Sequence, residues 1–500
     1  MAMSSKGSSS RSAGRSELSP MRMIRIVAVG LTVVLALAGC RKILNNDEEK
    51  MNTRMVNLLV DAPAVQYKLD DTVIASSVYQ GSTSLSAARP GSHPISFGAL
   101  RPTSLVSTDT TEPIALPGNF TRDFAKDTDY TIIAYGTMDA VQTLVLEDPT
   151  SKDDLADDTI ELKFVNAAPN VGSIDIFITA PEGGVTTPEN LGTVALGGKT
   201  PVRSMKLTKR ADVTDPNASL FTDLTVEVRE SGTGTVLYTS TKFRITEQAR
   251  VTLAVSRNVG PGPSPVQLVG IEGLSGPFTA PTDQAAVRVV NLSPDTPPID
   301  VIRASSTTTP IAQNLAFRGR SDYVLVPNGD VDLIAQPSGG QTSVFLFLEE
   351  ITAVAGTSYS AYAVGPLASI DAQVLTDDRR KVPTQAKFRF LNAAPSQIDG
   401  DGVDIYVTVP GLVLDFDSTD DKDTTDDAPQ FRRGTATVFH GVTDSFVYKA
   451  GTYQVRVMDT GTSRVLLDTT VTLVNGTVQT FALIDNENGQ LELQTVDEAI

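Results

Sequence analysis

The chain has 500 residues, with 41 Lys and Arg against 59 Asp and Glu, and a formal net charge of −18. This acidity argues against a protein that binds nucleic acid by neutralising phosphates. One Cys, two His and no Trp leave little for thiol or histidine catalysis or for a Cys/His zinc site. At about 150 residues per domain, the length predicts three or more domains.

The N-terminal segment has the features of an export signal. Arg22 and Arg25 precede an uncharged apolar run at 26–38. This run is shorter than the roughly 20 residues that a membrane-spanning helix needs, and a basic region before a short apolar region is typical of a secretory signal. Residues 1–20 are Ser-rich and basic, and a methionine follows them shortly, so we expect that the start has been placed too early.

The apolar run ends in Leu37-Ala38-Gly39-Cys40, which resembles a bacterial lipobox. The resemblance implies that Leu37, Ala38 and Gly39 are recognised by the signal peptidase and that Cys40 becomes the lipidated first residue. Several acyl chains on one Cys meet the two-signal requirement for stable anchoring. The alternative is a buried structural Cys after an ordinary signal. We expect a lipid-anchored protein of the cell envelope, in the outer membrane on its periplasmic or surface face.

A motif of Asn, a turn and an apolar-Asp-apolar strand recurs along the chain. The copies hold Asn166 with Asp175, Asn291 with Asp300, and Asn392 with Asp404, and an earlier copy has Asn57 but Gln66 in place of the Asp. The copies start about 100–125 residues apart. This spacing suits autonomous domains rather than a solenoid, whose repeats are about 20–45 residues long.

Within each repeat the hydrophobic pattern has a period of two. Residues 224–229 and 453–457 alternate apolar and polar side chains, which is typical of strands with one face in a core. Turn signals recur at about the 8–12-residue interval of an all-β protein. We therefore predict an all-β chain of tandem immunoglobulin-like antiparallel β-sandwich domains with about seven strands each.

Charged or Pro/Gly-rich joints set the expected boundaries. We expect a signal peptide at 1–39, a lipidated linker at 40–53, and β-sandwich repeats at 54–150, 159–272, 284–376 and 385–497. The linkers are short, so we expect a semi-rigid array.

The third repeat carries the most specific resemblance. Its segments VRVVNLSPDTPPIDVI at 287–302 and SDYVLVP at 321–327 resemble the bacterial family called domain of unknown function 4397. The resemblance covers most of residues 54–497, although the first repeat lacks the first Pro and the Asp, and the second departs after Leu196. It implies secreted or lipid-anchored sandwich modules with no settled activity.

The recurring carboxylates Asp175, Asp300 and Asp404 suggest acid–base or metal chemistry. A catalytic pair needs two carboxyl groups about 5–9 Å apart, however, and each repeat supplies one Asp between two apolar residues. We favour the structural alternative, in which each Asp accepts hydrogen bonds from backbone N–H groups of the neighbouring Asn-x-x-Pro turn.

The recurring asparagines Asn57, Asn166, Asn291 and Asn392 directly precede that turn. An Asn side chain can satisfy backbone groups where a strand breaks. We therefore expect these asparagines to be structural.

An acidic insert at 415–427 is the main candidate for a metal site. Asp415, Asp417, Asp421 and Asp423 offer the hard oxygen ligands that Ca²⁺ takes. The insert lacks the Gly and the final Glu of an EF-type loop, so we favour a solvated, self-repelling loop. His440 has no neighbouring Cys or His to share a metal. We expect no cofactor and no catalytic residues.

The composition and the repeats together favour a non-enzymatic binding or adhesion module. It would contact an unknown protein or glycan through loops on a rigid frame, for which the long inserts at 100–121 and 412–433 are the best candidates. The alternative is a passive spacer or stalk of the envelope. A carboxylate-dependent hydrolase is the least favoured hypothesis.

Overall fold

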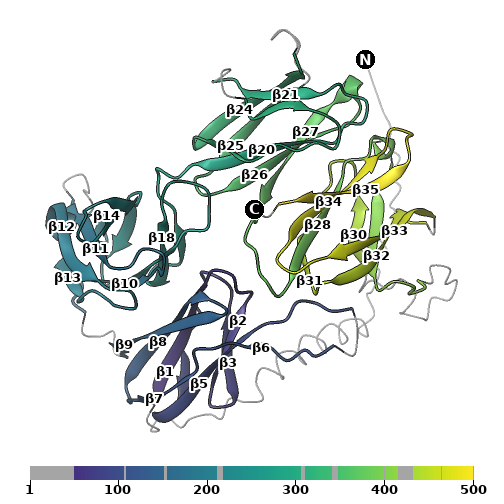
Figure 1. Ribbon diagram of the computed structural model, residues 1–500. Coiled ribbons are helices and arrows are strands. Elements are labelled where there is room, and N and C mark those ends of the chain that lie inside the picture. Colours follow the sequence, from purple (N-terminus) through teal and green to yellow (C-terminus); the bar gives the residue numbers. More distant parts are fainter. Residues whose placement is uncertain are drawn as a thin grey trace, which may run out of the picture. The chain divides into compact units, whose positions relative to one another are not determined.

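The computed structural model describes residues 50–498, apart from 106–108, 151–154, 211–214, 216–217, 306–309, 340–346, 399, 415–431 and 463. The strands in this part of the chain form eight sheets (Figure 1), and its only helices are the short 3₁₀ turns η1 (Pro181–Gly183), η2 (Leu367–Ser369) and η3 (Pro395–Gln397). The predicted class, tandem immunoglobulin-like β-sandwiches, is confirmed. None of the described segments forms a helix long and apolar enough to span a bilayer.

The first sandwich packs the sheet β4-β1-β8-β9 on the sheet β3-β2-β5-β6, with β7 beside β5. Its strands are β1 (Met51–Leu59), β2 (Val65–Leu69), β3 (Thr72–Ser77), β4 (Ser86–Ala88), β5 (Gly91–Ala99), β6 (Ile114–Ala115), β7 (Phe120–Phe124), β8 (Thr128–Thr137) and β9 (Ala140–Pro149). Buried residues of both sheets, among them Met55, Tyr67 and Phe97, form one core.

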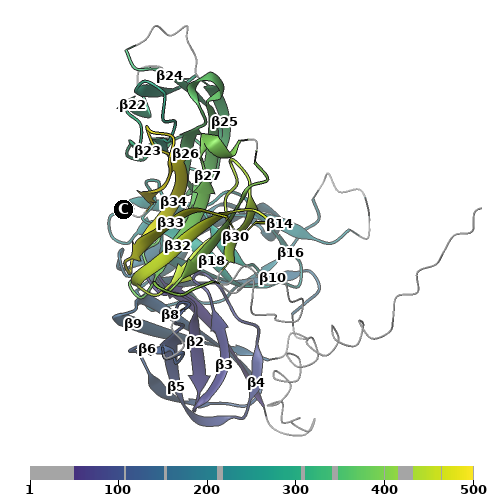
Figure 2. The ribbon, with the colours of Figure 1, turned by 90° about the vertical axis from the view of Figure 1, so that its right-hand side faces the viewer.

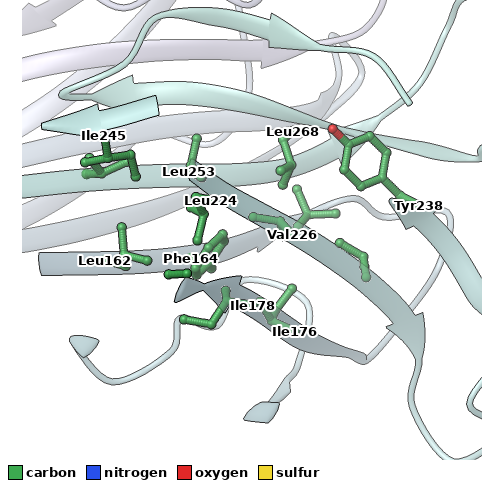
Figure 3. Packing of buried hydrophobic residues seen from close by; sticks show 14 of the residues in the cluster. Leu162, Phe164, Ile176, Ile178, Leu224, Val226, Tyr238, Ile245, Leu253 and Leu268 are labelled. Atoms are coloured by element: carbon green, nitrogen blue, oxygen red, sulfur yellow. The ribbon is translucent and has the colours of Figure 1, made fainter. Parts of the chain in front are cut away.

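The second sandwich packs β13-β10-β17-β18-β19 on β12-β11-β14-β15, with β16 beside β14. Its strands are β10 (Thr159–Ala167), β11 (Ile174–Ala180), β12 (Val185–Val194), β13 (Arg203–Lys206), β14 (Phe221–Glu230), β15 (Val236–Thr239), β16 (Phe243–Thr246), β17 (Arg250–Arg257), β18 (Val266–Glu272) and β19 (Gly276–Phe278). Figure 3 shows Phe164 from one sheet against Ile178 and Leu224 from the other. Strand β14 buries every second residue, as its alternating sequence predicts.

The third and fourth sandwiches share a simpler order, β23-β20-β26-β27 on β22-β21-β24-β25 and β31-β28-β34-β35 on β30-β29-β32-β33. The third has β20 (Ala285–Asn291), β21 (Ile299–Arg303), β22 (Ala312–Leu315), β23 (Val324–Val326), β24 (Gly329–Pro337), β25 (Phe347–Ala353), β26 (Ser358–Val364) and β27 (Asp371–Asp377). The fourth has β28 (Ala386–Asn392), β29 (Val403–Thr408), β30 (Arg432–Thr437), β31 (Phe446–Tyr448), β32 (Gly451–Asp459), β33 (Val465–Leu473), β34 (Val478–Asp485) and β35 (Leu491–Asp497). The long hairpin β32–β33 is visible in both views (Figures 1 and 2).

Each sandwich contains one parallel pair in an otherwise antiparallel arrangement. The first strand of each repeat lies parallel to a later strand, in the pairs β1–β8, β10–β17, β20–β26 and β28–β34. The repeating first strand is therefore an interior strand of its sheet, with an antiparallel neighbour on the other side. Its residues are almost all buried, on the side away from the sandwich core as well as on the core side.

Candidate functional site

The four recurring asparagines make the same hydrogen bonds in every sandwich. Each is fully buried, and its Oδ1 accepts the backbone N–H two residues later, at 3.1–3.3 Å. Its Nδ2 donates to the carbonyl of the last residue of a strand in the opposite sheet, which is Ser77, Val194, Leu315 or Thr437. These side chains therefore join the two sheets at the point where the first strand ends.

The recurring aspartates lie on the second strand of their repeats, but their partners differ from the expected turn. Asp300 Oδ1 accepts the backbone N–H of Asn314 at 2.7 Å, and Asp404 Oδ1 accepts that of Ala436 at 2.8 Å. Both donors have positive φ and lie where the register with the neighbouring strand shifts. A bulge leaves an N–H without a ladder partner, and the carboxylate on the outer face of the adjacent strand accepts it.

Asp175 occupies the equivalent place and accepts a hydrogen bond from the Thr193 hydroxyl at 2.6 Å. The register between β11 and β12 also shifts beside it. The three carboxylates are thus bound within separate sheets, and the structure does not bring any two of them together.

Several sequence-predicted residues lie outside the described residues. These are Leu37, Ala38, Gly39 and Cys40 of the lipobox and Asp415, Asp417, Asp421 and Asp423 of the acidic insert. Within the part of the chain that the structure describes, no group of three or more His, Cys, Asp and Glu could hold a metal ion. His440 lies in a turn with φ of 67°, where its N–H bonds to the Asn392 carbonyl and burial lowers its pKa.

The two inserts proposed as contact loops have different surroundings. We call residues 100–105 the strap, because Thr103 forms a parallel bridge with Tyr448 of the edge strand β31 in the fourth sandwich. Thr103 donates its N–H to Val447 and accepts the N–H of Lys449, both at 3.1 Å, and Leu105 packs on the fourth core. This part of the first insert is therefore bound to another domain of the same chain. Most of the second insert lies outside the described residues, but Val413 at its start is 86% exposed.

The outer side of the first strand carries a pattern that the sequence interpretation missed. Three residues before each recurring Asn stands a basic residue, and apolar residues flank the Asn on either side. The basic residues are Arg54, Lys163, Arg288 and Arg389. The flanking apolar residues are Val56 and Leu58, Val165 and Ala167, Val290 and Leu292, and Leu391 and Ala393. We call this side of each sheet the pairing face.

The pairing faces bury one another in two pairs. Apolar residues of the first and second sandwiches form one shared cluster, and those of the third and fourth form another. These clusters are separate from the four sandwich cores. Stacked sheets normally bury such faces against a neighbouring layer, so neighbouring sandwiches act here as layers for each other.

The basic residue of each sandwich contacts the other sandwich of its pair. Arg54 binds Glu272 of β18 at 3.2 Å, and Lys163 binds Asp148 of β9 at 2.5 Å. In the other pair, Arg389 binds Asp377 of β27 at 2.7 Å, and Arg288 donates to the backbone carbonyl of Asp497 in β35. Reciprocal contacts between equivalent positions are the mark of an isologous interface. Each pair thus repeats, within one chain, the geometry of a twofold dimer.

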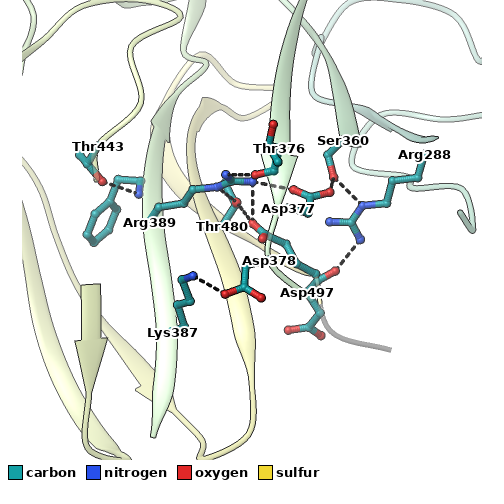
Figure 4. Close-up of polar contacts among 12 residues, drawn as sticks. Arg288, Ser360, Thr376, Asp377, Asp378, Lys387, Arg389, Thr443, Thr480 and Asp497 are labelled. Atoms are coloured by element: carbon teal, nitrogen blue, oxygen red, sulfur yellow. Dashed lines mark hydrogen bonds and ion pairs between the residues drawn. The ribbon is translucent and has the colours of Figure 1, made fainter. Parts of the chain in front are cut away.

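The interface between the third and fourth sandwiches contains a buried ionic network (Figure 4). Nη2 of Arg389 lies 2.7 Å from Asp377 and 2.9 Å from Glu498, whose side chains are 0% and 2% exposed. Burial, reinforced by the charge of Asp377, raises the pKa of Glu498. Burial alone would lower the pKa of Arg389, but the carboxylates of Glu498 and Asp377 raise it. The guanidinium therefore binds two carboxylates in a buried interface.

Comparison with known proteins identifies a family for two regions. Residues 52–177 and 285–406 match the family "Domain of unknown function (DUF4397)". Each match spans one whole sandwich and ends within the second strand of its pairing partner. No curated protein is significantly similar to the chain.

Solved structures give only distant likenesses. The Bacillus anthracis TIE protein is 7% identical over 92% of this chain and 78% of its own, with a TM-score of 0.14. A putative adhesin from Bacteroides ovatus is 10% identical over 48% of this chain and 97% of its own, with a TM-score of 0.13. A fimbrial assembly protein from Parabacteroides distasonis is 12% identical over 44% and 98%, with a TM-score of 0.18. Such scores carry no argument about function, and the identification rests on the family match: the chain contains repeated domains of the DUF4397 family.

Proposed function

We propose that the chain is a lipid-anchored, non-enzymatic binding or adhesion module of the cell envelope. The Leu37-Ala38-Gly39-Cys40 sequence supports the anchor. The paired sandwiches support a platform on which loops keep fixed positions, because each pairing buries both apolar surface and charge. Loops on a rigid frame are suited to recognition.

The strap is the observation that favours a binding platform over a passive spacer. In a stalk of serial modules each module contacts its neighbours in the sequence. Here the strap of the first sandwich adds a bridge to the edge of the fourth, between Thr103 and Tyr448, and Arg380 donates to the Ala62 carbonyl. A chain that folds back on itself in this way gives up the reach that a spacer would provide.

The second insert, residues 412–433, is the contact loop that we propose. The strap in the first insert is bonded to the fourth sandwich, whereas the second insert starts with the exposed Val413 and is rich in acidic residues. It leaves the fourth sandwich between β29 and β30, on the sheet that does not form the pairing face.

Metabolic labelling tests the anchor. Cells that produce the full chain are grown with labelled palmitate, and the purified protein is compared with the Cys40→Ala variant. We expect label on the unaltered chain and none on the variant. Label that persists in Cys40→Ala, or a full chain without label, would contradict lipid anchoring.

Bead adhesion tests the binding role. Beads coated with the full chain are mixed with intact cells that lack the protein, before and after protease or periodate treatment of the cells, which separates protein from glycan partners. We expect adhesion that is lost when residues 415–431 are deleted and retained when the β14–β15 turn at 231–234 is shortened. Adhesion that survives the 415–431 deletion would refute the contact loop. No adhesion by any form would favour the spacer.

A further inference from the structure

In the described part of the chain, two arginines of the linker that follows β27 form no ion pair. Asp377 and Glu498 both bind Arg389, and Asp378 binds Lys387 at 2.7 Å. No carboxylate oxygen of the described residues forms an ion pair with Arg379 or Arg380, which follow directly. Arg380 instead donates to the Ala62 carbonyl and lies over the Tyr79 ring.

Arg379 has weak partners. Its guanidinium stacks on Tyr323, with Cζ 3.9 Å from the ring centroid, and Nη1 makes one long hydrogen bond of 3.4 Å to Ser358. Its Nε is buried and has no hydrogen-bond partner within the described structure. Burial, with a contribution from nearby Arg288, lowers the pKa of Arg379, although Tyr323 and Asp377 act in the opposite direction. A partly buried cation is costly when the nearby carboxylate, here that of Asp377, forms its ion pair with another arginine, so an anion at this place would stabilise Arg379.

A cleft of about 400 Å³ opens beside these arginines. Loops of the first three sandwiches line it with neutral polar side chains, which include Gln80, Asn258, Gln267 and Ser358. Asp377 and Asp378 also border the cleft, but their carboxylates are bound by Arg389 and Lys387. The volume is within the range of roughly 300–1,000 Å³ typical of small-molecule sites.

Two glycines allow the loops around this cleft to approach closely. A Cβ on Gly260 would lie 2.6 Å from the carbonyl oxygen of Gly356. Gly356 itself has a φ of +77°, which disfavours any other residue. The backbone of these two loops therefore forms part of the cleft wall.

We propose that this cleft binds a small oxyanion, a carboxylate or phosphate group, through Arg379 with support from Arg380. Among the described residues, Nε of Arg379 has no partner, its Nη1 makes only the long hydrogen bond to Ser358, and its planar guanidinium matches the geometry of such groups. Neutral polar groups line the cleft around Arg379, and both carboxylates that border the cleft are bound by other basic residues. This inference goes beyond the proposed function, since the anchor and the contact loop could each fail while the cleft still binds its anion.

Calorimetric titration of the full chain with inorganic phosphate and with citrate tests the proposal. We expect saturable binding of at least one of the two at a single site, weakened about tenfold or more in Arg379→Gln and weakened by added salt. Arg464→Gln is the matched control, because Arg464 lies in an exposed hairpin turn of the fourth sandwich. Its affinity should equal that of the unaltered chain.

A second variant keeps the test independent of any effect of Arg379 on folding. Gln80→Glu places a carboxylate in the same cleft without touching the arginines, and we expect it to weaken anion binding as well. Each variant's melting temperature without ligand is measured alongside. Absence of saturable binding of either anion, or affinities unchanged in both Arg379→Gln and Gln80→Glu, would overturn the proposal.

Discussion

Replacing Arg389 by Met should strongly destabilise the pairing of the third and fourth sandwiches. The substitution leaves two carboxylates, Asp377 and Glu498, in an interface where they are almost fully buried. Removing one partner of a buried ion pair costs about 3–5 kcal/mol, and here one guanidinium serves two carboxylates. A loss of this size is a large fraction of the roughly 5–15 kcal/mol that stabilises a typical domain.

Hydrogen–deuterium exchange measures this loss strand by strand, which suits a chain with several domains. We expect faster exchange in β26 and β34, the strands paired with β20 and β28. The control is Arg464→Met in the same sandwich, whose ion pair with Asp459 is 69% and 35% exposed and should contribute no more than about 1 kcal/mol. Equal effects of the two substitutions would refute the view that the ionic network holds the pair together.

Three further predictions follow from individual contacts. Burial raises the pKa of Glu498, so the folded chain binds the Glu498 proton more readily than the unfolded chain, and this contribution to stability falls as pH rises from about 4.5. In urea titrations the unaltered chain should gain stability relative to Glu498→Gln as pH falls from 7 towards 4.5. A difference that stays constant over this range would contradict the prediction. Asn291→Ala should cost about 1–3 kcal/mol for each buried backbone group left unsatisfied, measured by urea unfolding, whereas Asn488→Ala in the exposed β34–β35 turn should cost far less. Thr103→Pro removes the N–H that bonds to Val447 and should release the strap together with Leu105, which packs on the fourth core. Chymotrypsin should therefore cut after Leu105 faster than in Thr110→Pro, and equal rates would show that the strap is not held there.

The sequence alone was sufficient to predict the all-β fold class and the repeated domain. Alternation at 224–229 predicts a strand because one face meets a core, and β14 has that burial pattern. The recurring asparagines stand out because a buried amide that joins two sheets needs the same residue at the same step of every copy. Both features depend on neighbours close in the sequence or on strict repetition, which a single sequence displays.

The pairing faces escaped prediction because their partners are distant in the sequence. The basic residue three positions before each Asn is visible in all four repeats, but an exposed strand end explains such a residue equally well. Only the structure shows that Lys163 meets Asp148 and that Arg389 meets Asp377. The aspartates were assigned to the wrong neighbour for a related reason, since a β-bulge in the next strand has no clear local signature.

An exchange of charges in the first pair tests most directly that the sandwiches form fixed pairs rather than independent modules. Lys163 and Asp148 lie 2.5 Å apart, and the Lys side chain is only 7% exposed. Lys163→Asp and Asp148→Lys should each place like charges together and speed amide exchange in β8 and β17, while the double variant should restore protection in both strands. If the single variants exchange like the unaltered chain, or the double variant is no better protected than either single one, the paired arrangement is contradicted.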